Sequence, residues 1–119
     1  MPVVMPLDLP PQQVVCVAQA IYHEARGESE MGQRGVAHVI LNRAKKSKTK
    51  PCVVLHAPGQ FKIRFKKSYA GKAWDKAWQL ANHPGLDPTG GALYFIHQRV
   101  TISWKARLTT IIGSHKFYK

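Results

Sequence analysis

Acidic residues are scarce in this sequence. Its 119 residues include 6 Asp and Glu against 18 Lys and Arg, which gives a formal net charge of +12. Such an imbalance predicts attraction to a polyanion, whether nucleic acid, an anionic membrane surface or an acidic cell-wall polymer. Half of the six acids nevertheless fall close together, at Glu24, Glu28 and Glu30. This cluster is the first place to look for chemistry.

Long apolar runs are also missing. No segment approaches the roughly 20 apolar residues that a membrane-spanning helix needs. Residues 1–11 are apolar, but prolines interrupt them and no basic residue precedes them. We therefore expect an extended N-terminal arm and not a signal peptide.

Cysteine is nearly absent, with only Cys16 and Cys52 and no C-x-x-C pair. A disulfide between them can form in an oxidising compartment. Because no signal peptide is recognised, two buried thiols are the favoured expectation, and the bridge stays open as the alternative.

Several catalytic motifs are missing. His23 and Glu24 begin like a zinc-binding helix, but Gly27 stands where its second histidine belongs. The sequence contains no G-x-S-x-G, no phosphate-binding or dinucleotide fingerprint, and no known nucleic-acid-reading motif. We expect no metal and no cofactor. Acid/base chemistry by carboxylates remains.

Apolar residues recur at helical spacing from Val14 to Ala25, which predicts a helix that stops at Gly27. Glu24 lies at the edge of the apolar stripe in the last turn. A carboxyl group half shielded from water there has a raised pKa, as proton donation requires.

A second helix is predicted from Ser29, its N-cap, to Ala44. Gly32 and Gly35 within it are read as allowing close approach of the first helix. The basic loop 45–51 follows. The run 51–55 is undecided between helix and strand.

The second half of the chain predicts one more helix and then short strands. The helix covers about 68–82, with Trp74 and Trp78 expected in the core rather than as sugar platforms. The alternation at 62–67 indicates an exposed strand or irregular edge. Strands are expected at 92–96 and 100–104, with extended or turn structure at 109–112 and 115–118. The prediction is a single α+β domain, 1–119, mainly helical with a small antiparallel sheet in its C-terminal half.

The number of carboxylates separates two kinds of glycan cleavage. Hydrolysis usually uses two, for which the candidates are Glu24, Glu28, Glu30 and Asp87. A lytic transfer needs one, because the sugar's own hydroxyl replaces water and a single Glu both gives and takes the proton. Asp87, next to Pro88, is expected to cap a turn. The residues favour Glu24 and do not name the substrate.

Several blocks of the sequence are familiar in combination. They are AIYHEARGE at 20–28, GQ at 32–33, VAHVILNR at 36–43, GQF at 59–61, DPTGGALYF at 87–95 and HKFY at 115–118. Together and in this order they resemble the SleB/CwlJ family of cell-wall hydrolases.

The resemblance implies a lysozyme-like, lytic-transglycosylase-like fold. It also implies peptidoglycan cleavage between N-acetylmuramic acid and N-acetylglucosamine. The family's single catalytic glutamate matches Glu24. By position in the blocks, the residues expected to bind substrate are Arg26, Glu28, Gln60, Phe61, Thr89, Gly90, Ala92, Tyr94 and His115. The residues alone leave Tyr94 and His115 open between core and subsite, and Glu28 is expected to orient Arg26 or the substrate.

A compact, basic catalytic domain without a signal peptide looks like a bacteriophage endolysin. Such an enzyme waits in the host cytoplasm and reaches the periplasm and cell wall when the membrane opens. We expect a monomer that acts on peptidoglycan, with an anionic outer-membrane surface as a second partner and no nucleic acid. Two alternatives stay open: a hydrolytic muramidase with two carboxylates, and a non-enzymatic basic module that binds wall polymer or nucleic acid.

Overall fold

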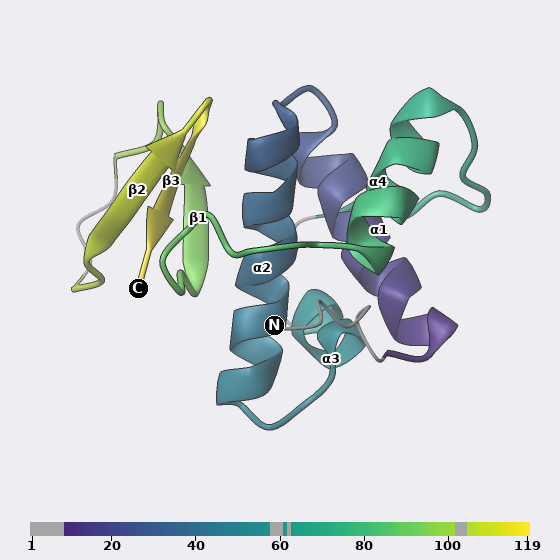
Figure 1. Ribbon diagram of the computed structural model, residues 1–119, viewed down its shortest axis with the longest axis horizontal. Coiled ribbons are helices and arrows are strands. Elements are labelled where there is room, and N and C mark those ends of the chain that lie inside the picture. Colours follow the sequence, from purple (N-terminus) through teal and green to yellow (C-terminus); the bar gives the residue numbers. More distant parts are fainter. Residues whose placement is uncertain (1–8, 58–60, 62, 102–104) are drawn as a thin grey trace, which may run out of the picture.

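The computed structural model describes residues 9–57, 61, 63–101 and 105–119. Helices precede strands along the chain: α1 Pro11–Ala25, α2 Glu30–Lys46, α3 Pro51–His56, α4 Lys72–Asn82, β1 Tyr94–His97, β2 Leu108–Ile112 and β3 His115–Tyr118. The sheet lies on one side of α2 and the other helices lie on the other side (Figure 1). The expected α+β architecture, helix-rich with a small antiparallel sheet in the C-terminal half, is confirmed.

Helix α1 is the central element of the helical part. It packs against α2, α3 and α4, and its residues Val17, Ala18, Ala20 and Ile21 are fully buried. Pro11 is the first residue of the helix, a position at which the backbone N–H that proline lacks has no partner within the helix. Ala25 is the last residue of the helix, as predicted. Of the helices in the described ranges, none is long and apolar enough to cross a membrane.

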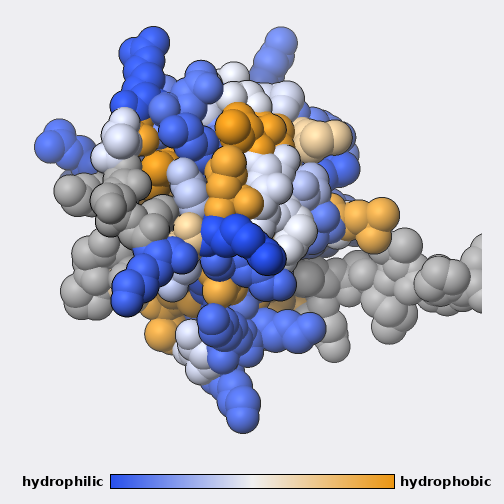
Figure 2. Space-filling view, turned by 90° about the vertical axis from the view of Figure 1, so that its left-hand side faces the viewer, coloured by the Kyte–Doolittle hydropathy of each residue, from blue (hydrophilic) through white to orange (hydrophobic). Residues whose placement is uncertain are grey.

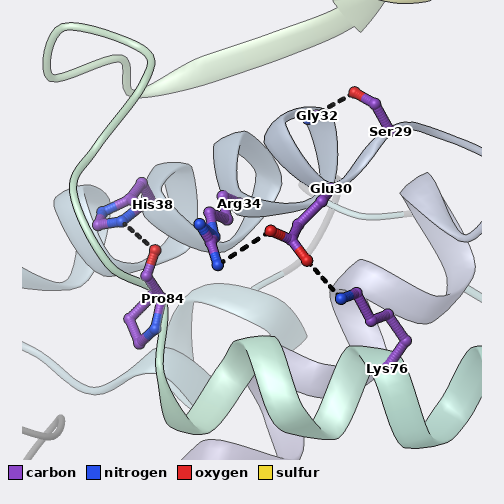
Figure 3. Close-up of polar contacts among 7 residues, drawn as sticks. All are labelled: Ser29, Glu30, Gly32, Arg34, His38, Lys76 and Pro84. Atoms are coloured by element: carbon purple, nitrogen blue, oxygen red, sulfur yellow. Dashed lines mark hydrogen bonds and ion pairs between the residues drawn. The ribbon is translucent and has the colours of Figure 1, made fainter.

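Polar contacts hold the start of α2. Ser29 caps the helix as predicted, and its Oγ accepts a hydrogen bond of 3.2 Å from the backbone N–H of Gly32. Glu30 pairs with Arg34 one turn later at 3.2 Å and with Lys76 of α4. Figure 3 shows Glu30 between these two cations, so that one surface carboxylate ties α2 to α4.

The sheet packs on α2 through one of its faces. Its strand order is β1-β3-β2, all antiparallel, with Phe95 paired to Phe117 across β1 and β3. Phe117 is fully buried against Val39 of α2. A Cβ at Gly35 would lie 2.7 Å from the Phe117 ring. The prediction that Gly32 and Gly35 admit α1 is therefore wrong: both face the sheet and the chain leading into it.

The undecided run at 51–55 is helical, as α3. It packs on α1, which brings Cys16 and Cys52 to a Cα separation of 5.2 Å, and the two are joined by a disulfide. The expectation of two free thiols is wrong, because nothing local in the sequence shows that these two helices lie side by side.

Two further predictions need correction. Helix α4 starts at Lys72 and not near 68, because Gly71 has a left-handed backbone, φ 101°. Of the strand expected at 100–104, residues 100–101 form no strand and 102–104 lie outside the described residues, whereas residues 63–67 are irregular, which is one of the two predicted alternatives. The strands that pair with β3 are β1 and β2 instead, and a tight turn at Gly113 joins β2 to β3. Hydrogen-bonding partners, and not local alternation, decided which extended segments became strands.

Candidate active site

Glu24 lies in the last turn of α1, on the side of the helix that carries the fully buried Ala20 and Ile21. Its own side chain is half-buried. Burial raises the pKa of the Glu24 carboxyl above the ordinary glutamate value, because the charged form loses water. Within the described part of the chain this carboxyl has no hydrogen-bond or ion-pair partner. Among the described residues, nothing therefore engages this carboxyl group, and its raised pKa favours the protonated form.

The neighbouring acids are engaged elsewhere. Glu28 Oε1 accepts a hydrogen bond of 2.8 Å from the backbone N–H of Ser114, in the turn between β2 and β3. Glu30 is ion-paired, and the hydrogen bond from Lys76 lowers the pKa of its carboxyl. Of the two roles expected for Glu28, the structure shows no contact with Arg26 among the described residues, because the carboxylate binds the β-hairpin; orientation of the substrate stays a prediction.

Asp87 is bound on both of its oxygens. Its Oδ1 accepts hydrogen bonds from the backbone N–H and hydroxyl of Thr89, at 2.8 and 2.6 Å. Its Oδ2 accepts from Asn42 Nδ2 and the backbone N–H of Gly91, each at 3.0 Å. Burial acts to raise the pKa of Asp87, but the hydrogen bonds from Thr89 and Asn42 outweigh it and the pKa falls. Asp87 thus caps its turn, as predicted from Pro88.

The same turn determines the places of Thr89, Gly90 and Ala92. Thr89 and Ala92 are 1% and 0% exposed, and the Thr89 hydroxyl also accepts the N–H of Ala92 at 3.0 Å. Gly90 is exposed, with φ 69°. The expectation that Thr89 and Ala92 contact substrate is revised: their side chains face the interior, and they contribute by shaping the loop.

An aromatic cluster that sequence reasoning missed surrounds the end of α1. Arg26 donates a hydrogen bond of 3.0 Å to the Tyr22 hydroxyl, and Lys66 donates one of 3.2 Å to the same oxygen. The hydrogen bond from Lys66 lowers the pKa of Tyr22. His23 Nε2 and the Tyr69 hydroxyl share a hydrogen bond of 2.8 Å.

Trp74 and Trp78 continue this cluster. The Tyr69 and Trp74 rings lie 4.6 Å apart, and those of Trp74 and Trp78 lie 6.3 Å apart. Both tryptophans pack partly buried against the main core, as expected. The only signal in the sequence was the density of aromatic residues at 61–78, which does not say where they meet.

A second group of aromatic rings links Phe61 to the sheet. Phe61 and Phe95 lie 6.0 Å apart, and Phe95 and His115 lie 5.1 Å apart. The Arg43 guanidinium lies 5.7 Å from the centre of the Phe61 ring and 5.5 Å from that of Tyr94. Arg43 was not among the predicted site residues, although it lies in the block at 36–43. Gln60 lies outside the described residues.

His115 is buried beneath this group. It is 5% exposed, and among the described residues its Nδ1 has no hydrogen-bond partner. Burial lowers the pKa of His115, the nearby Glu28 acts in the opposite direction, and His97 adds to the lowering. The imidazole lies on the buried face of the sheet, and sugar binding by His115 stays a prediction.

The described residues contain no cluster of three or more His, Cys, Asp or Glu side chains that could hold a metal ion. The arrangement is a lone, half-buried carboxyl group of raised pKa, with cations and aromatic rings close to it in the chain. A carboxyl group of raised pKa can give and take a proton, and this is the chemistry that such an arrangement allows.

Comparison with solved structures agrees with this fold. The chain is similar to the catalytic domain of the Bacillus cereus SleB protein, with a TM-score of 0.70 and 30% identity over 100% of this chain and 98% of that one. It is equally similar to the catalytic domain of a germination-specific lytic transglycosylase, SleB from Bacillus anthracis, with a TM-score of 0.71 and 30% identity over 97% and 100% of the two chains.

Sequence comparison identifies the family. The model of the cell wall hydrolase family matches residues 27–118, and the chain belongs to that family. A spore cortex-lytic enzyme of Oceanobacillus iheyensis is 36% identical over 114 residues, 87% of this chain and 40% of the relative. One of Halalkalibacterium halodurans is 34% identical over 113 residues, 85% and 33%. The chain thus spans well under half the length of these relatives, and the family match begins three residues after Glu24.

Proposed function

We propose that this chain degrades peptidoglycan as a lytic transglycosylase with Glu24 as its single catalytic carboxylate. The family and the relatives, spore cortex-lytic enzymes and a lytic transglycosylase, support the substrate class. The observation that carries the mechanism is the contrast among the acids: Glu24 is half-buried, unpartnered and of raised pKa, whereas Glu28, Glu30 and Asp87 are all bound to other groups.

The proposed reaction uses one carboxyl group twice, first as an acid and then as a base. The Glu24 carboxyl protonates the glycosidic oxygen between N-acetylmuramic acid and N-acetylglucosamine, and the bond from the muramic anomeric carbon to that oxygen breaks. The resulting carboxylate takes the proton of the muramic residue's own hydroxyl as its oxygen bonds to the same anomeric carbon. The product carries an anhydro end, and Glu24 regains its proton. A raised pKa suits this cycle because it favours the protonated form with which the cycle starts.

The surroundings of Glu24 supply the proposed glycan contacts. Arg26, the half-buried Phe61 and Tyr94 on the sheet edge are predicted residues whose side chains reach the surface, and the half-buried Glu28 does so as well. Aromatic rings with nearby guanidinium groups suit stacking against sugar faces. We assign Gly90 to the same groove through its exposed backbone, and Gln60 by its place in the sequence.

The test is the product chemistry of matched variants on purified peptidoglycan. We expect Glu24→Gln to lower the rate of muropeptide release by about 10³-fold or more, while circular dichroism and binding to the polymer are unchanged. Glu30→Gln, which alters an exposed ion pair, is the matched control and retains activity. Anhydro ends in the mass spectrum support transglycosylation.

Other outcomes point elsewhere. Reducing ends that carry oxygen from labelled water would identify a hydrolytic muramidase. Full activity of Glu24→Gln would remove Glu24 from the mechanism. Binding without any release by the wild-type chain would leave the non-enzymatic binding module as the function.

We further propose that the chain serves a bacteriophage as an endolysin, held in the host cytoplasm and released to the periplasm. The net charge of +12 supports this role, because it suits both acidic stem peptides and an anionic membrane. The Cys16–Cys52 bond would then close after release into the oxidising periplasm. Expression in a bacterial host should cause lysis only when a pore-forming holin is co-expressed. Lysis without the holin contradicts the proposal.

A further inference from the structure

The two faces of the sheet have different surroundings. One face carries the cross-strand pairs of Phe95 with Phe117 and His97 with His115, and it packs on α2. Side chains alternate along a strand, so their neighbours in sequence form the opposite face. The rows of that outer face are Leu108–Tyr118–Tyr94 and Ile111–Lys116–Ile96. It is built of apolar and aromatic residues around one lysine.

Much of this outer face is open to solvent. Leu108 is 46% exposed, Ile111 53% and Tyr94 38%, while Ile96 and Tyr118 are half-buried. Figure 2 views the molecule from the sheet side: apolar side chains form a central band with hydrophilic ones to either side. Exposed apolar residues that gather on one face mark an interaction surface more often than scattered single ones do.

The sheet segment itself carries charges of one sign. Residues 89–119, which contain the whole sheet, include five Lys and Arg and no Asp or Glu. They are Arg99, Lys105, Arg107, Lys116 and Lys119. At the end of the sheet, Lys119 also lines a hollow of about 500 Å³ together with Lys45 and Lys46 of α2. A partner of this surface must therefore accept apolar side chains and be negatively charged.

We propose that the outer face of the sheet binds the surface of an anionic lipid bilayer. Apolar side chains such as Leu108 and Ile111 enter the boundary between headgroups and acyl chains, and the surrounding cations meet the anionic headgroups. A dissolved polyanion such as nucleic acid satisfies the cations but leaves the apolar band in water, so it fits less well. Of the residues on this face, Tyr94 is also assigned to the glycan contacts, so the test substitutes Leu108, Ile111 and Lys116 instead, and it measures vesicle binding without peptidoglycan cleavage.

Vesicle flotation tests the proposal directly. The wild-type chain should float with vesicles of phosphatidylcholine containing phosphatidylglycerol and not with pure phosphatidylcholine, at about 0.1 M salt. The double variant Leu108→Ser/Ile111→Ser should lose at least about tenfold in partitioning to the anionic vesicles. Lys116→Glu should lose a similar factor, because it reverses the charge in the middle of the face.

Val53→Ser is the matched control. Val53 is 56% exposed, as Ile111 is, but it belongs to α3, among the helices. It should bind vesicles as the wild type does. Muropeptide release from lipid-free peptidoglycan by the double variant should stay at the wild-type rate, which shows that the fold is intact.

Three results overturn the proposal. They are absence of wild-type binding to anionic vesicles, equal binding by the wild type and the double variant, and equal loss in Val53→Ser. If charge reversal weakens binding but the two serine substitutions do not, the surface recognises polyanions in general, nucleic acid included, and not a bilayer.

Discussion

The carboxylate of Glu28 and the backbone N–H of Ser114 meet across 86 positions of sequence, with 2.8 Å between Oε1 and N. Glu28 follows Glu24 by four residues, so this contact fastens the β2–β3 turn beside the end of the proposed catalytic helix. Gln33 Nε2 donates a hydrogen bond of 3.0 Å to the carbonyl oxygen of the same Glu28. The residue that joins the helical part to the sheet is thus itself held in place.

Shortening Glu28 should therefore loosen the hairpin. We expect Glu28→Ala to lower the free energy of unfolding by about 1–3 kcal/mol, because the Ser114 N–H loses its acceptor. Glu28→Gln should cost less, since the amide oxygen still accepts. Gly113→Ala should also destabilise, because Gly113 has φ 56° and an added Cβ would overlap Glu28 Oε1. Urea denaturation measures all three.

The double variant Glu28→Ala/Gly113→Ala separates the two causes. Without the long side chain at 28 the overlap disappears, so the double variant should lose less than the sum of the single losses. Strict additivity would show that the two positions do not interact through the carboxylate.

Gly35 offers a test of how closely α2 and the sheet approach. An alanine normally stabilises a helix interior by about 1 kcal/mol relative to glycine. At Gly35 the new Cβ would lie 2.7 Å from the Phe117 ring, so we expect Gly35→Ala to lower the free energy of unfolding by about 1–3 kcal/mol instead. Gly27→Ala is the control, with no heavy atom within 4 Å of the added carbon. A stabilised Gly35→Ala would contradict this packing.

The Cys16–Cys52 disulfide should stabilise the junction of α1 and α3. Its closed loop spans a sequence separation of 36 residues, for which about 2–4 kcal/mol is typical. Adding a reductant should lower the thermal midpoint of the wild type. The double variant Cys16→Ser/Cys52→Ser should have a lower thermal midpoint than the wild type, and the reductant should not change that midpoint. An unchanged midpoint of the wild type on reduction would mean that the bond contributes nothing to stability.

The raised pKa of Glu24 predicts a pH dependence with a definite sign. A folded-state pKa above the unfolded one means that the folded state binds the proton more tightly. The contribution is fully present below the ordinary glutamate pKa and is lost as pH rises through the raised folded value. Glu24→Gln removes this loss, so at neutral pH it should be more stable than the wild type, by about 0.5–2 kcal/mol.

The same pKa should appear in activity. Muropeptide release should fall as pH rises past the raised pKa, because the proton donor is then ionised.

Thermal unfolding of the wild type and of Glu24→Gln, at acidic and at neutral pH, provides the stability comparison. A difference between them that grows toward acid would have the wrong sign for this explanation.

Local signals predicted the first two helices well. The apolar spacing through Ile21 and the stop after Ala25 are properties of neighbouring residues, and so is the cap that Ser29 supplies to Gly32. The turn around Asp87 was also readable, because Asp before Pro88 and two glycines bonds its own backbone. Such features depend on a few consecutive residues, so they can be predicted without knowing how the rest of the chain folds.

Predictions that needed a distant partner failed. Gly35 faces Phe117, 82 positions later, and not α1. Thr89 and Ala92 stand within a matched block, yet they are buried, since a block does not say which way a side chain points. Lys66 and Tyr69 meet Tyr22, in the last turns of α1, although no motif joins the three residues.

The sequence by itself determined the class of chemistry, the family and Glu24 as the residue to test, because these follow from residue types, their spacing and the order of the blocks. Only the tertiary structure decided that Glu28, Glu30 and Asp87 are bound to other groups, whereas Glu24 has no hydrogen-bond or ion-pair partner among the described residues. The reason is physical: a carboxylate's role depends on its water, its donors and its neighbouring charges, and folding brings these from far along the chain.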